Sequence, residues 1–312
     1  MKKYNSYKEL SAQKGTVVTL GSFDGVHLGH RSILKRLTQD TANNHLESVV
    51  LTFFPHPRMV LNQNEPIFLL NTIEEKSKLL EEIGVQHLVI QEFTKDFSEL
   101  TAEEFVEQVL VKHFNIRKII IGYDHRFGNN RSADIFDLIR LGNKYRFDVE
   151  QITAQEIDEV SISSTKIRKA LLEGNVKVAN EYLGSNYSLT GPVVKGKQLG
   201  RMIGFPTANI SLAENYKLIP KKGAYVVKTL ISDKEVWGMM NIGNNPTVND
   251  AHILNIEVHL LDFSEDIYGE KITVELIDFL REEEKFNSLD ELIAQLNKDR
   301  EQTKNIVKKR SF

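Results

Sequence analysis

Short apolar runs alternate with segments of helical period from residue 16 to about residue 175. The helical segments include "IEEKSKLLEEI" (73–83) and "TAEEFVEQVLVKHF" (101–114), in which Thr101 and Glu104 form a capping box. Strands that alternate with helices indicate right-handed βαβ crossovers, and therefore a mainly parallel sheet with helices on both faces. The apolar runs are "TVVTL" (16–20), "ESVVLTF" (47–53), "QHLVIQ" (86–91), "KIIIG" (118–122) and "DVEQI" (148–152).

The pattern changes near residue 184. Extended segments joined by short turn-like links predict antiparallel strands that close into a small barrel or sandwich. A long helix is expected from Ser288, which pairs with Glu291 in a second capping box. We therefore expect two domains, residues 1–183 and 184–312. The extended segments are "SLTGPVV" (188–194), "GAYVVKTLIS" (223–232), "EVWGMMNIG" (235–243), "LNIEVHLL" (254–261) and "GEKITVELIDFL" (269–280).

Composition narrows the class of protein. The 312 residues are 41% hydrophobic and 27% charged, with a net charge of -3 and no long basic run, so nucleic acid is not an expected partner. The absence of cysteine excludes a disulfide scaffold and thiolate chemistry. No apolar stretch is long enough to span a membrane or to act as an export signal. We expect a cytoplasmic protein, and its oligomeric state stays open.

The stretch "GSFDGVHLGH" (21–30) follows the first apolar run and precedes a helical segment. Glycine allows tight turns, and the free N–H groups at the start of a helix attract phosphate. His27 and His30 lie three residues apart, so a helix that begins near Leu28 would turn both imidazoles toward one bound group. Two alternatives are open at this stage: a metal site formed by Asp24, His27 and His30, or a purely structural turn.

Three other loops of this half carry unusual side chains. His56 stands between two prolines in "TFFPHP", and Asp124 lies in "GYDHRFG", each just after an apolar run. In "SISSTKIR" (161–168), hydroxyl groups open a helix whose first turns also hold Lys166 and Arg168, an arrangement that an anion would stabilise. Since ligands bind beyond the carboxyl ends of parallel strands, these loops together predict a triphosphate site.

Together these four stretches resemble the FMN adenylyltransferase domain of bacterial bifunctional FAD synthetases, the riboflavin kinase/FMN adenylyltransferase family. The family motifs G-x-F-D-G-x-H-x-G-H, T-F-x-P-H-P, G-x-D/N-x-x-F-G and I-S-S-T-x-I-R occur here in that order. The sequence departs from them at His125, where many relatives carry an aromatic residue. The resemblance implies a Rossmann-like nucleotidylyltransferase fold, catalytic roles for His27 and His30, and the following contacts. ATP would meet Gly21, Phe23, Asp24, Gly29, Ser163, Ser164, Thr165 and Arg168, and flavin would meet His56 and Asp124.

The second half contains "GPVVKGKQLGRMIGFPTANI" (191–210). Its G-x-x-x-x-G-K spacing is not a Walker loop, because Gln198 replaces the Ser or Thr that would hold Mg²⁺ and the neighbouring strands are predicted to be antiparallel. Thr207 and Asn209 are two residues apart, so on an extended strand their oxygens share a face and are suited to Mg²⁺. Glu257 alternates with apolar neighbours and is expected on the opposite face of its strand.

These stretches, with "NIGNNPT" and "YGEKITVELIDFLREEEKF", resemble the riboflavin kinase module of the same family. The resemblance implies a six-stranded antiparallel barrel with a C-terminal helix. It also implies that Glu257 is the catalytic base and that Arg281 lies against the flavin, with Asn241 and "NNPT" lining the same site. ATP and Mg²⁺ would be bound by Thr207 and Asn209, and ATP also by Gly196 and Lys197.

The function expected from this resemblance is the phosphorylation of riboflavin to FMN and the adenylylation of FMN to FAD, with ATP as co-substrate and Mg²⁺ as cofactor. Two alternatives remain at the level of the sequence. One is a nucleotidylyltransferase that acts on a non-flavin phosphate, and the other is a flavin carrier or sensor without turnover.

Overall fold

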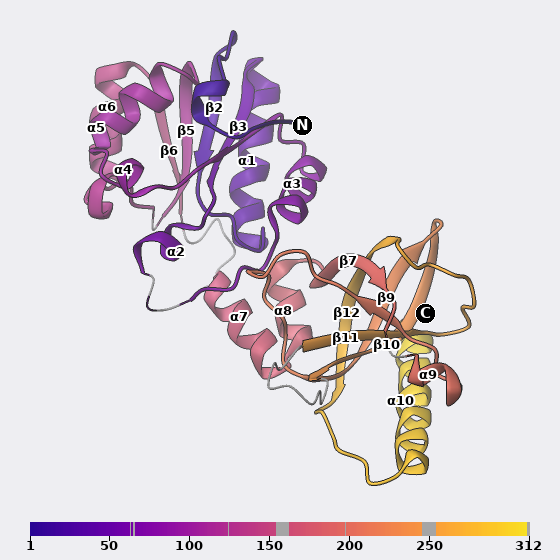
Figure 1. Cartoon of the computed structure of the whole chain (residues 1–312). Helices are drawn as coiled ribbons and strands as arrows, with labels where there is room; N and C mark the ends of the chain where they lie inside the picture. The colour runs from indigo at the N-terminus through magenta and orange to yellow at the C-terminus, as the bar shows by residue number, and fades with distance from the viewer. Residues whose placement is uncertain are drawn as a thin grey trace. The chain divides into compact units, whose positions relative to one another are not determined.

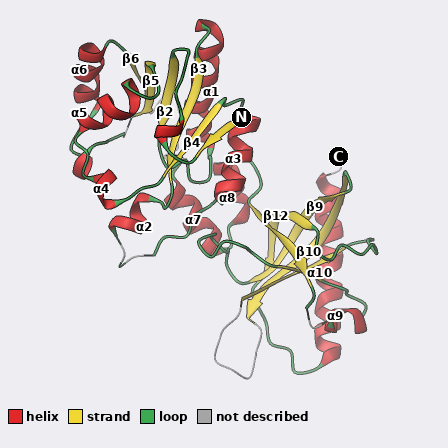
Figure 2. Cartoon of the chain, turned by 45° about the horizontal axis from the view of Figure 1, so that its top comes forward, coloured by secondary structure: helices red, strands yellow, loops and turns green. Residues whose placement is uncertain are grey.

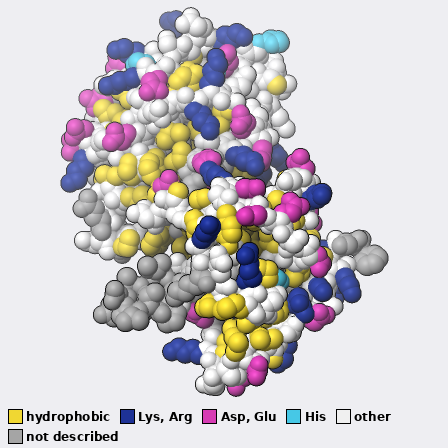
Figure 3. All heavy atoms as spheres, turned by 45° about the vertical axis from the view of Figure 1, so that its right-hand side comes forward, with side chains coloured by type: hydrophobic (Ala, Val, Ile, Leu, Met, Phe, Trp, Pro, Cys, Tyr) yellow, Lys and Arg dark blue, Asp and Glu magenta, His cyan; other side chains and the backbone are white. Residues whose placement is uncertain are grey.

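The computed structural model describes residues 1–62, 64, 66–123, 125–153, 162–196, 198–244 and 254–310. The chain divides into two compact units, Met1–Ser164 and Thr165–Phe312. Figure 1 shows an α/β unit followed by a β-rich unit, and Figure 2 separates helices from strands by colour. On the face drawn in Figure 3, acidic and basic side chains are interspersed, in keeping with the near-neutral net charge.

The first unit is a parallel sheet whose described strands run in the order β1-β4-β3-β2-β5-β6. Since β2 pairs with β3 on one side and with β5 on the other, the direction of the chain across the sheet reverses at β2. The strands are β1 (Lys2–Tyr4), β2 (Thr16–Leu20), β3 (Glu47–Phe53), β4 (His87–Gln91), β5 (Ile116–Gly122) and β6 (Asp148–Ile152).

Helices cover both faces of this sheet, as Figure 1 shows. Adjacent strand residues such as Val17 and Val18 are both buried but belong to different hydrophobic clusters. One cluster lies beneath the helices of residues 28–44 and 73–82, and the other beneath those of residues 102–105 and 135–145. The helical segments of this unit are α1 (Leu28–Asn44), α2 (Pro57–Leu61), α3 (Ile73–Glu82), α4 (Lys95–Ser98), α5 (Ala102–Phe105) and α6 (Ile135–Tyr145). The next helix, α7 (Ser164–Glu173), begins at the last residue of the first unit and continues into the second. Shorter 3-10 turns occupy η1 (Tyr7–Glu9) and η3 (Asn129–Arg131), and η2 (Val106–Val111) is a π-helical continuation of α5.

The second unit is a closed antiparallel barrel whose described strands run in the order β10-β11-β8-β7-β12-β9. This confirms the predicted barrel, and β7 and β8, the strands on either side of the G-x-x-x-x-G-K stretch, are antiparallel as expected. The strands are β7 (Ser188–Val194), β8 (Ala208–Ile210), β9 (Gly223–Ile231), β10 (Lys234–Asn244), β11 (Leu254–Leu260) and β12 (Lys271–Arg281). The helices are α8 (Val176–Leu183), α9 (Leu199–Met202) and α10 (Leu289–Arg310).

Some local expectations differ from the structure. The N-terminal segment forms β1, a strand that the sequence did not predict, because its residues are mostly exposed and carry no apolar alternation. The predicted capping box of Thr101 and Glu104 is confirmed. At α10 Ser288 accepts from the backbone N–H of Glu291, while the Glu291 carboxylate accepts from Asn287.

The first compact unit ends at Ser164, before the boundary that the strand pattern predicts near residue 184. The intervening helix α8 contacts β12 of the barrel, and its Lys177 lies 2.9 Å from the carboxylate of Asp278. The chain between the two positions therefore packs with the barrel.

Gly191 is expected to be required for barrel closure. A Cβ at this position would lie 2.1 Å from the carbonyl oxygen of Ser211, a backbone atom that cannot rotate away. Gly191→Ala should lower the free energy of unfolding of the barrel by about 1–3 kcal/mol. Urea titration followed by the fluorescence of Trp237, the single tryptophan of the chain, reports on the barrel. Ser188→Ala on the same strand is the control, and equal midpoints for the two variants would contradict this account.

Candidate active sites

The glycine-rich loop lies where the strand order of the parallel sheet reverses. It joins the end of β2 to α1, which begins at Leu28 as expected. Phe23, Gly25 and Val26 all have positive φ, at 45°, 88° and 42°. Such angles are unfavourable for residues with a Cβ, so the surrounding structure must hold the loop in place.

Asp24 is one of the groups that hold this loop. Its carboxylate is 1% exposed, and Oδ1 accepts from the backbone N–H groups of Leu70 at 2.8 Å and Asn71 at 3.4 Å. Its carbonyl oxygen accepts from the hydroxyl of Ser164 at 2.9 Å. These bonds turn Asp24 toward the protein, and the described residues contain no group of three acidic or imidazole side chains that could hold a metal ion. Asp24 therefore serves to hold the backbone of the loop in place.

The two imidazoles of the loop lie against each other. The rings of His27 and His30 are stacked with centroids 3.6 Å apart and an angle of 18° between their planes. His27 caps α1, because its Nδ1 accepts from the backbone N–H of His30 at 3.4 Å. Among the described residues, no hydrogen-bond partner lies against Nδ1 of His30, which is buried. The pair is thus brought together as the spacing predicts, and the buried Nδ1 of His30 has no partner among the described residues.

His30 is held in its neutral form. Burial, the adjacent His27 ring and the ammonium of Lys76 together keep the pKa of His30 well below its ordinary value of 6.5. A neutral imidazole donates through one nitrogen only, so His30 is suited to donate a hydrogen bond to a phosphate oxygen rather than to carry a full charge.

The other residues predicted to bind ATP in this half occupy ends of elements. Gly21 directly follows β2 and donates to the carbonyl of Leu51 at 3.1 Å, while Gly29 is buried in the first turn of α1. The ring of Phe23 packs edge-on against His30 with centroids 5.2 Å apart. Ser163 precedes α7, and the first turns of α7 contain Ser164, Thr165 and Arg168.

The residues predicted to meet flavin are described only in part. His56 caps the short helix α2 after β3 by accepting from the backbone N–H of Arg58 at 3.1 Å, and Asp124 lies outside the described residues. His125, the departure from the family motif, stacks on Phe127 with a centroid distance of 6.2 Å.

A group of aromatic side chains near the ends of β3 and β4 escaped the sequence analysis. Phe53 and Phe93 meet at 5.6 Å between centroids, and Phe93 and Phe97 at 6.1 Å. All three are only half-buried. Phe53 belongs to the "TFFPHP" stretch, but Phe93 and Phe97 come from another segment, so no local pattern predicts that the three rings meet.

In the barrel, polar side chains from three neighbouring strands form a row. Glu257 on β11 pairs with Asn241 of β10 on one side and with Asn209 of β8 on the other. Glu257 is half-buried between apolar residues that are fully buried, which confirms that it lies opposite the apolar face. Its Oε2 accepts from the Thr207 hydroxyl at 3.4 Å, and its Oε1 accepts from the side-chain amide of Asn255.

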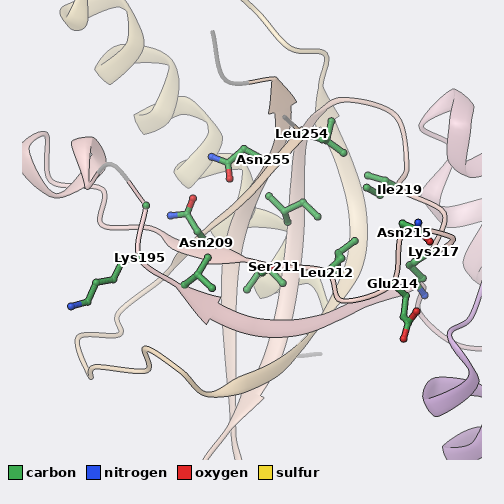
Figure 4. Close-up of a pocket in the computed structure, with 14 residues that line it drawn as sticks. Lys195, Asn209, Ser211, Leu212, Glu214, Asn215, Lys217, Ile219, Leu254 and Asn255 are labelled. Atoms are coloured by element: carbon green, nitrogen blue, oxygen red, sulfur yellow. The ribbon is translucent and has the colours of Figure 1, made fainter. Parts of the chain in front are cut away.

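A pocket of 540 Å³ opens beside this row, and Figure 4 shows Asn209 and Asn255 near one end of it, with Lys217 and Glu214 at the other. Gly196 lines the same pocket, and any Cβ there would lie 2.3 Å from the amide nitrogen of Asn209. The backbone thus approaches Asn209 too closely for a side chain. Thr207 lines a second pocket of 360 Å³. Lys197 and residues 245–247 of "NNPT" lie outside the described residues.

Arg281 ends β12 and is tied to the C-terminal helix. Its Nε lies 3.1 Å from both carboxylate oxygens of Asp299, and its Nη2 donates to Oδ2 at 2.9 Å. Asp299 is 2% exposed and also accepts from Gln295 at 2.8 Å. The guanidinium lies 5.7 Å from the ring centroid of Phe286. The position of Arg281 is therefore fixed by α10.

Comparison with known proteins agrees with this division. A family model described as FAD synthetase matches residues 9–166, and one described as riboflavin kinase matches residues 183–307. The chain is 40% identical over 289 residues to the bifunctional riboflavin kinase/FMN adenylyltransferase of Listeria monocytogenes, covering 92% of this chain and 91% of the relative. The Escherichia coli protein of the same name is 39% identical over 288 residues, with the same coverage.

A solved structure, "Crystal Structure of Macrolide-efflux Protein from Streptococcus pneumoniae", superposes with a TM-score of 0.86 at 34% identity, covering 97% of this chain and 98% of that one. Over the described part of this chain, no helix has the length and apolar character needed to cross a membrane. Two family models that match successive parts of the chain, and relatives of 39–40% identity over nearly its whole length, establish its kinship. The chain belongs to the family of bifunctional riboflavin kinase/FMN adenylyltransferases.

Proposed function

We propose that this chain makes FMN from riboflavin in its barrel and then makes FAD from FMN in its α/β unit, with ATP as the co-substrate of both steps. The observation that carries this proposal is that each family model falls on one of the two candidate sites. The paired imidazoles lie in the part that matches FAD synthetase, and the row of polar side chains at Glu257 lies in the part that matches riboflavin kinase.

In the kinase step, Glu257 removes the proton from the ribityl 5′-hydroxyl of riboflavin. That oxygen forms a bond to the γ-phosphorus of ATP while the bond from the γ-phosphorus to the bridging oxygen breaks, and ADP leaves. The bonds that Glu257 accepts from Thr207 and Asn255 support this role, because they hold the half-buried carboxylate in one orientation. In this proposal Arg281 contacts the flavin, and Gly196 and Lys197 also contact the ATP.

The donor groups in the barrel fit Mg²⁺. A hydroxyl, an amide and a carboxylate lie together at Thr207, Asn209 and Glu257, and Mg²⁺ prefers such oxygen ligands together with those of nucleotide phosphates. Thr207 and Asn209 would hold the ion. When bound, Mg²⁺ neutralises the negative charge of the transferred phosphate.

In the adenylyl transfer, a phosphate oxygen of FMN attacks the α-phosphorus of ATP, and pyrophosphate leaves with the bridging oxygen. We assign His27 and His30 to stabilising the charge that develops around the α-phosphorus. The unpartnered ring nitrogen of His30 supports this assignment. The β- and γ-phosphates would be held by Ser163, Ser164, Thr165 and Arg168.

On the flavin side, we propose that His56 and Asp124 position the FMN. The half-buried rings of Phe53, Phe93 and Phe97 offer an apolar surface on which a planar isoalloxazine can pack. Gly21, Phe23, Asp24 and Gly29 form the loop around the ATP phosphates.

Three broader expectations belong with this proposal. We place the boundary between the catalytic domains near residue 184, which the start of the riboflavin kinase match at residue 183 supports, while the chain from Thr165 packs with the barrel. We also propose a cytoplasmic enzyme without nucleic-acid or membrane partners, in keeping with a net charge of -3.

The two sites are expected to fail separately. His30→Ala should lower FAD formation by about 10²- to 10³-fold and spare FMN formation. Glu257→Ala should lower FMN formation by about 10²- to 10⁴-fold and spare FAD formation from supplied FMN. Chromatography of riboflavin, FMN and FAD over time measures both steps. If both activities fell together in each folded variant, the assignment of two sites would be wrong.

The same assay separates the alternatives. A carrier or sensor would change flavin fluorescence without consuming ATP, and a transferase for another phosphate would leave supplied FMN unchanged.

The kinase step is expected to depend on the oxygens that would hold Mg²⁺. Thr207→Val removes the hydroxyl at nearly constant volume and should raise the Mg²⁺ concentration for half-maximal FMN formation about tenfold. Titration of the initial rate with Mg²⁺ at saturating ATP measures this. Thr190→Val, at an exposed hydroxyl on β7, is the control. An unchanged Mg²⁺ requirement in Thr207→Val would remove Thr207 from the proposed site.

The lowered pKa of His30 predicts how stability depends on pH. Below pH 6.5 the unfolded chain binds a proton at His30 that the folded protein does not. The free energy of unfolding is therefore highest above pH 6.5 and decreases as the pH falls below that value. His30→Gln cannot titrate, and its urea midpoint should therefore fall less between pH 7 and pH 5 than that of the wild type. Circular dichroism follows the transition. His45→Asn, at an exposed position, should behave as the wild type, and an equal fall in His30→Gln would refute the burial of a neutral His30.

A further inference from the structure

Lys76 is a buried lysine beneath the glycine-rich loop. It lies in the second turn of α3 and is 3% exposed. Its Nζ donates to the carbonyl oxygen of Ser22 at 2.7 Å, and the same oxygen accepts from the hydroxyl of Thr52 at 3.2 Å. Ser22 belongs to the loop between β2 and His27, so the ammonium is hydrogen-bonded directly to the backbone of the candidate ATP site.

The charge of Lys76 is retained although the group is buried. Burial lowers the pKa of Lys76 from 10.5 to about 8, against the opposing influence of the Asp24 carboxylate, and the amine is thus mostly protonated at neutral pH. A hydrogen bond from a charged donor is roughly twice as strong as one between neutral groups. The bond from Lys76 is therefore the stronger of the two that Ser22 accepts.

The backbone conformation of the loop requires hydrogen bonds of this kind. Phe23 and Val26 have positive φ and both carry a Cβ, so the loop would relax to another conformation without bonds from its surroundings. The bonds described above act on two successive parts of the loop: Lys76 and Thr52 on Ser22, and Ser164 and the 70–71 backbone on Asp24.

Burying the charged amine of a lysine costs free energy, because the amine loses its hydration. Replacement of buried charges by apolar side chains of similar size is often neutral for stability, so packing alone does not call for an amine here. What an apolar residue cannot supply is the bond to Ser22 and a positive charge beneath the loop.

We propose that Lys76 is a positioning residue for adenylyl transfer, whose ammonium holds the glycine-rich loop in the conformation that directs His27 and His30 toward the ATP phosphates. This inference rests on the proposed function of the loop. Lys76 acts through the Ser22 carbonyl and does not itself touch the substrate.

The test uses the full-length protein and FAD formation from supplied FMN and ATP. Lys76→Met removes the ammonium and should lower kcat about 10- to 100-fold, since misplacement of reacting groups by about 1 Å has effects of this size. KM for FMN should stay unchanged, because the flavin side is not involved. Lys76→Arg keeps the charge and the donor and should recover most of the loss. Lys78→Met, at an exposed lysine of the same helix, should match the wild type.

Riboflavin phosphorylation by the same preparation serves as an internal control and should not change. A folded Lys76→Met enzyme with the kcat of Lys78→Met would overturn the inference, as would a loss confined to KM for FMN. If Lys76→Met does not fold, Lys76→Gln replaces it with the same expectation and the same refuting result. A wild-type protein that forms no FAD would instead refute the proposed function, so the two failures are distinguishable.

Discussion

Both units of this protein enclose apolar cores, and this constraint decides where polar chemistry can lie. The parallel sheet is covered on both faces, so its strands carry apolar side chains on each side and polar groups gather in the loops beyond the strand ends. The barrel encloses its core, so Glu257 and its neighbours lie on the outer face of the strands. The candidate site of the α/β unit is therefore formed by loops, whereas that of the barrel is formed by side chains aligned on neighbouring strands.

The two constructions differ in how they fix their side chains. In the barrel, hydrogen bonding between strands aligns Asn241, Glu257 and Asn209, and Thr207 and Asn255 donate to the Glu257 carboxylate. In the α/β unit, the loop after β2 adopts backbone angles that no sheet imposes, and it is held by Asp24 and by donors from α3 and α7. Buried polar groups around the loop are the consequence, because a loop without a ladder of its own must satisfy its carbonyls elsewhere.

Sequence patterns predicted the parts whose signal is local. The strands after residue 16 other than the short β8, the capping box at Thr101 and the start of α1 at Leu28 follow from periodicity and from the chemistry of helix ends. Lys76 shows the limit of such patterns. Its helix α3 is rich in Glu and Lys, and nothing in the local sequence distinguishes the buried Lys76 from the exposed Lys78. β1 and the Phe53, Phe93 and Phe97 rings were missed for a related reason: their environment is created by segments far apart in the sequence.

The end of β12 shows how the barrel and its C-terminal helix share one residue. The register of β12 against β9 shifts between Leu276 and Asp278 and again between Phe279 and Arg281, and bulges of this kind redirect side chains. Arg281 is thereby directed to Asp299 of α10, while its Nη1 donates to the carbonyl of Glu282 at 3.1 Å. Since these bonds engage Nε, Nη1 and Nη2, they leave at most about two of the five guanidinium N–H groups for a ligand. A flavin at this end of the barrel would therefore meet Arg281 mainly through the face and edge of a guanidinium that α10 holds rigid. The helix would then take part in the proposed kinase site without contact to substrate.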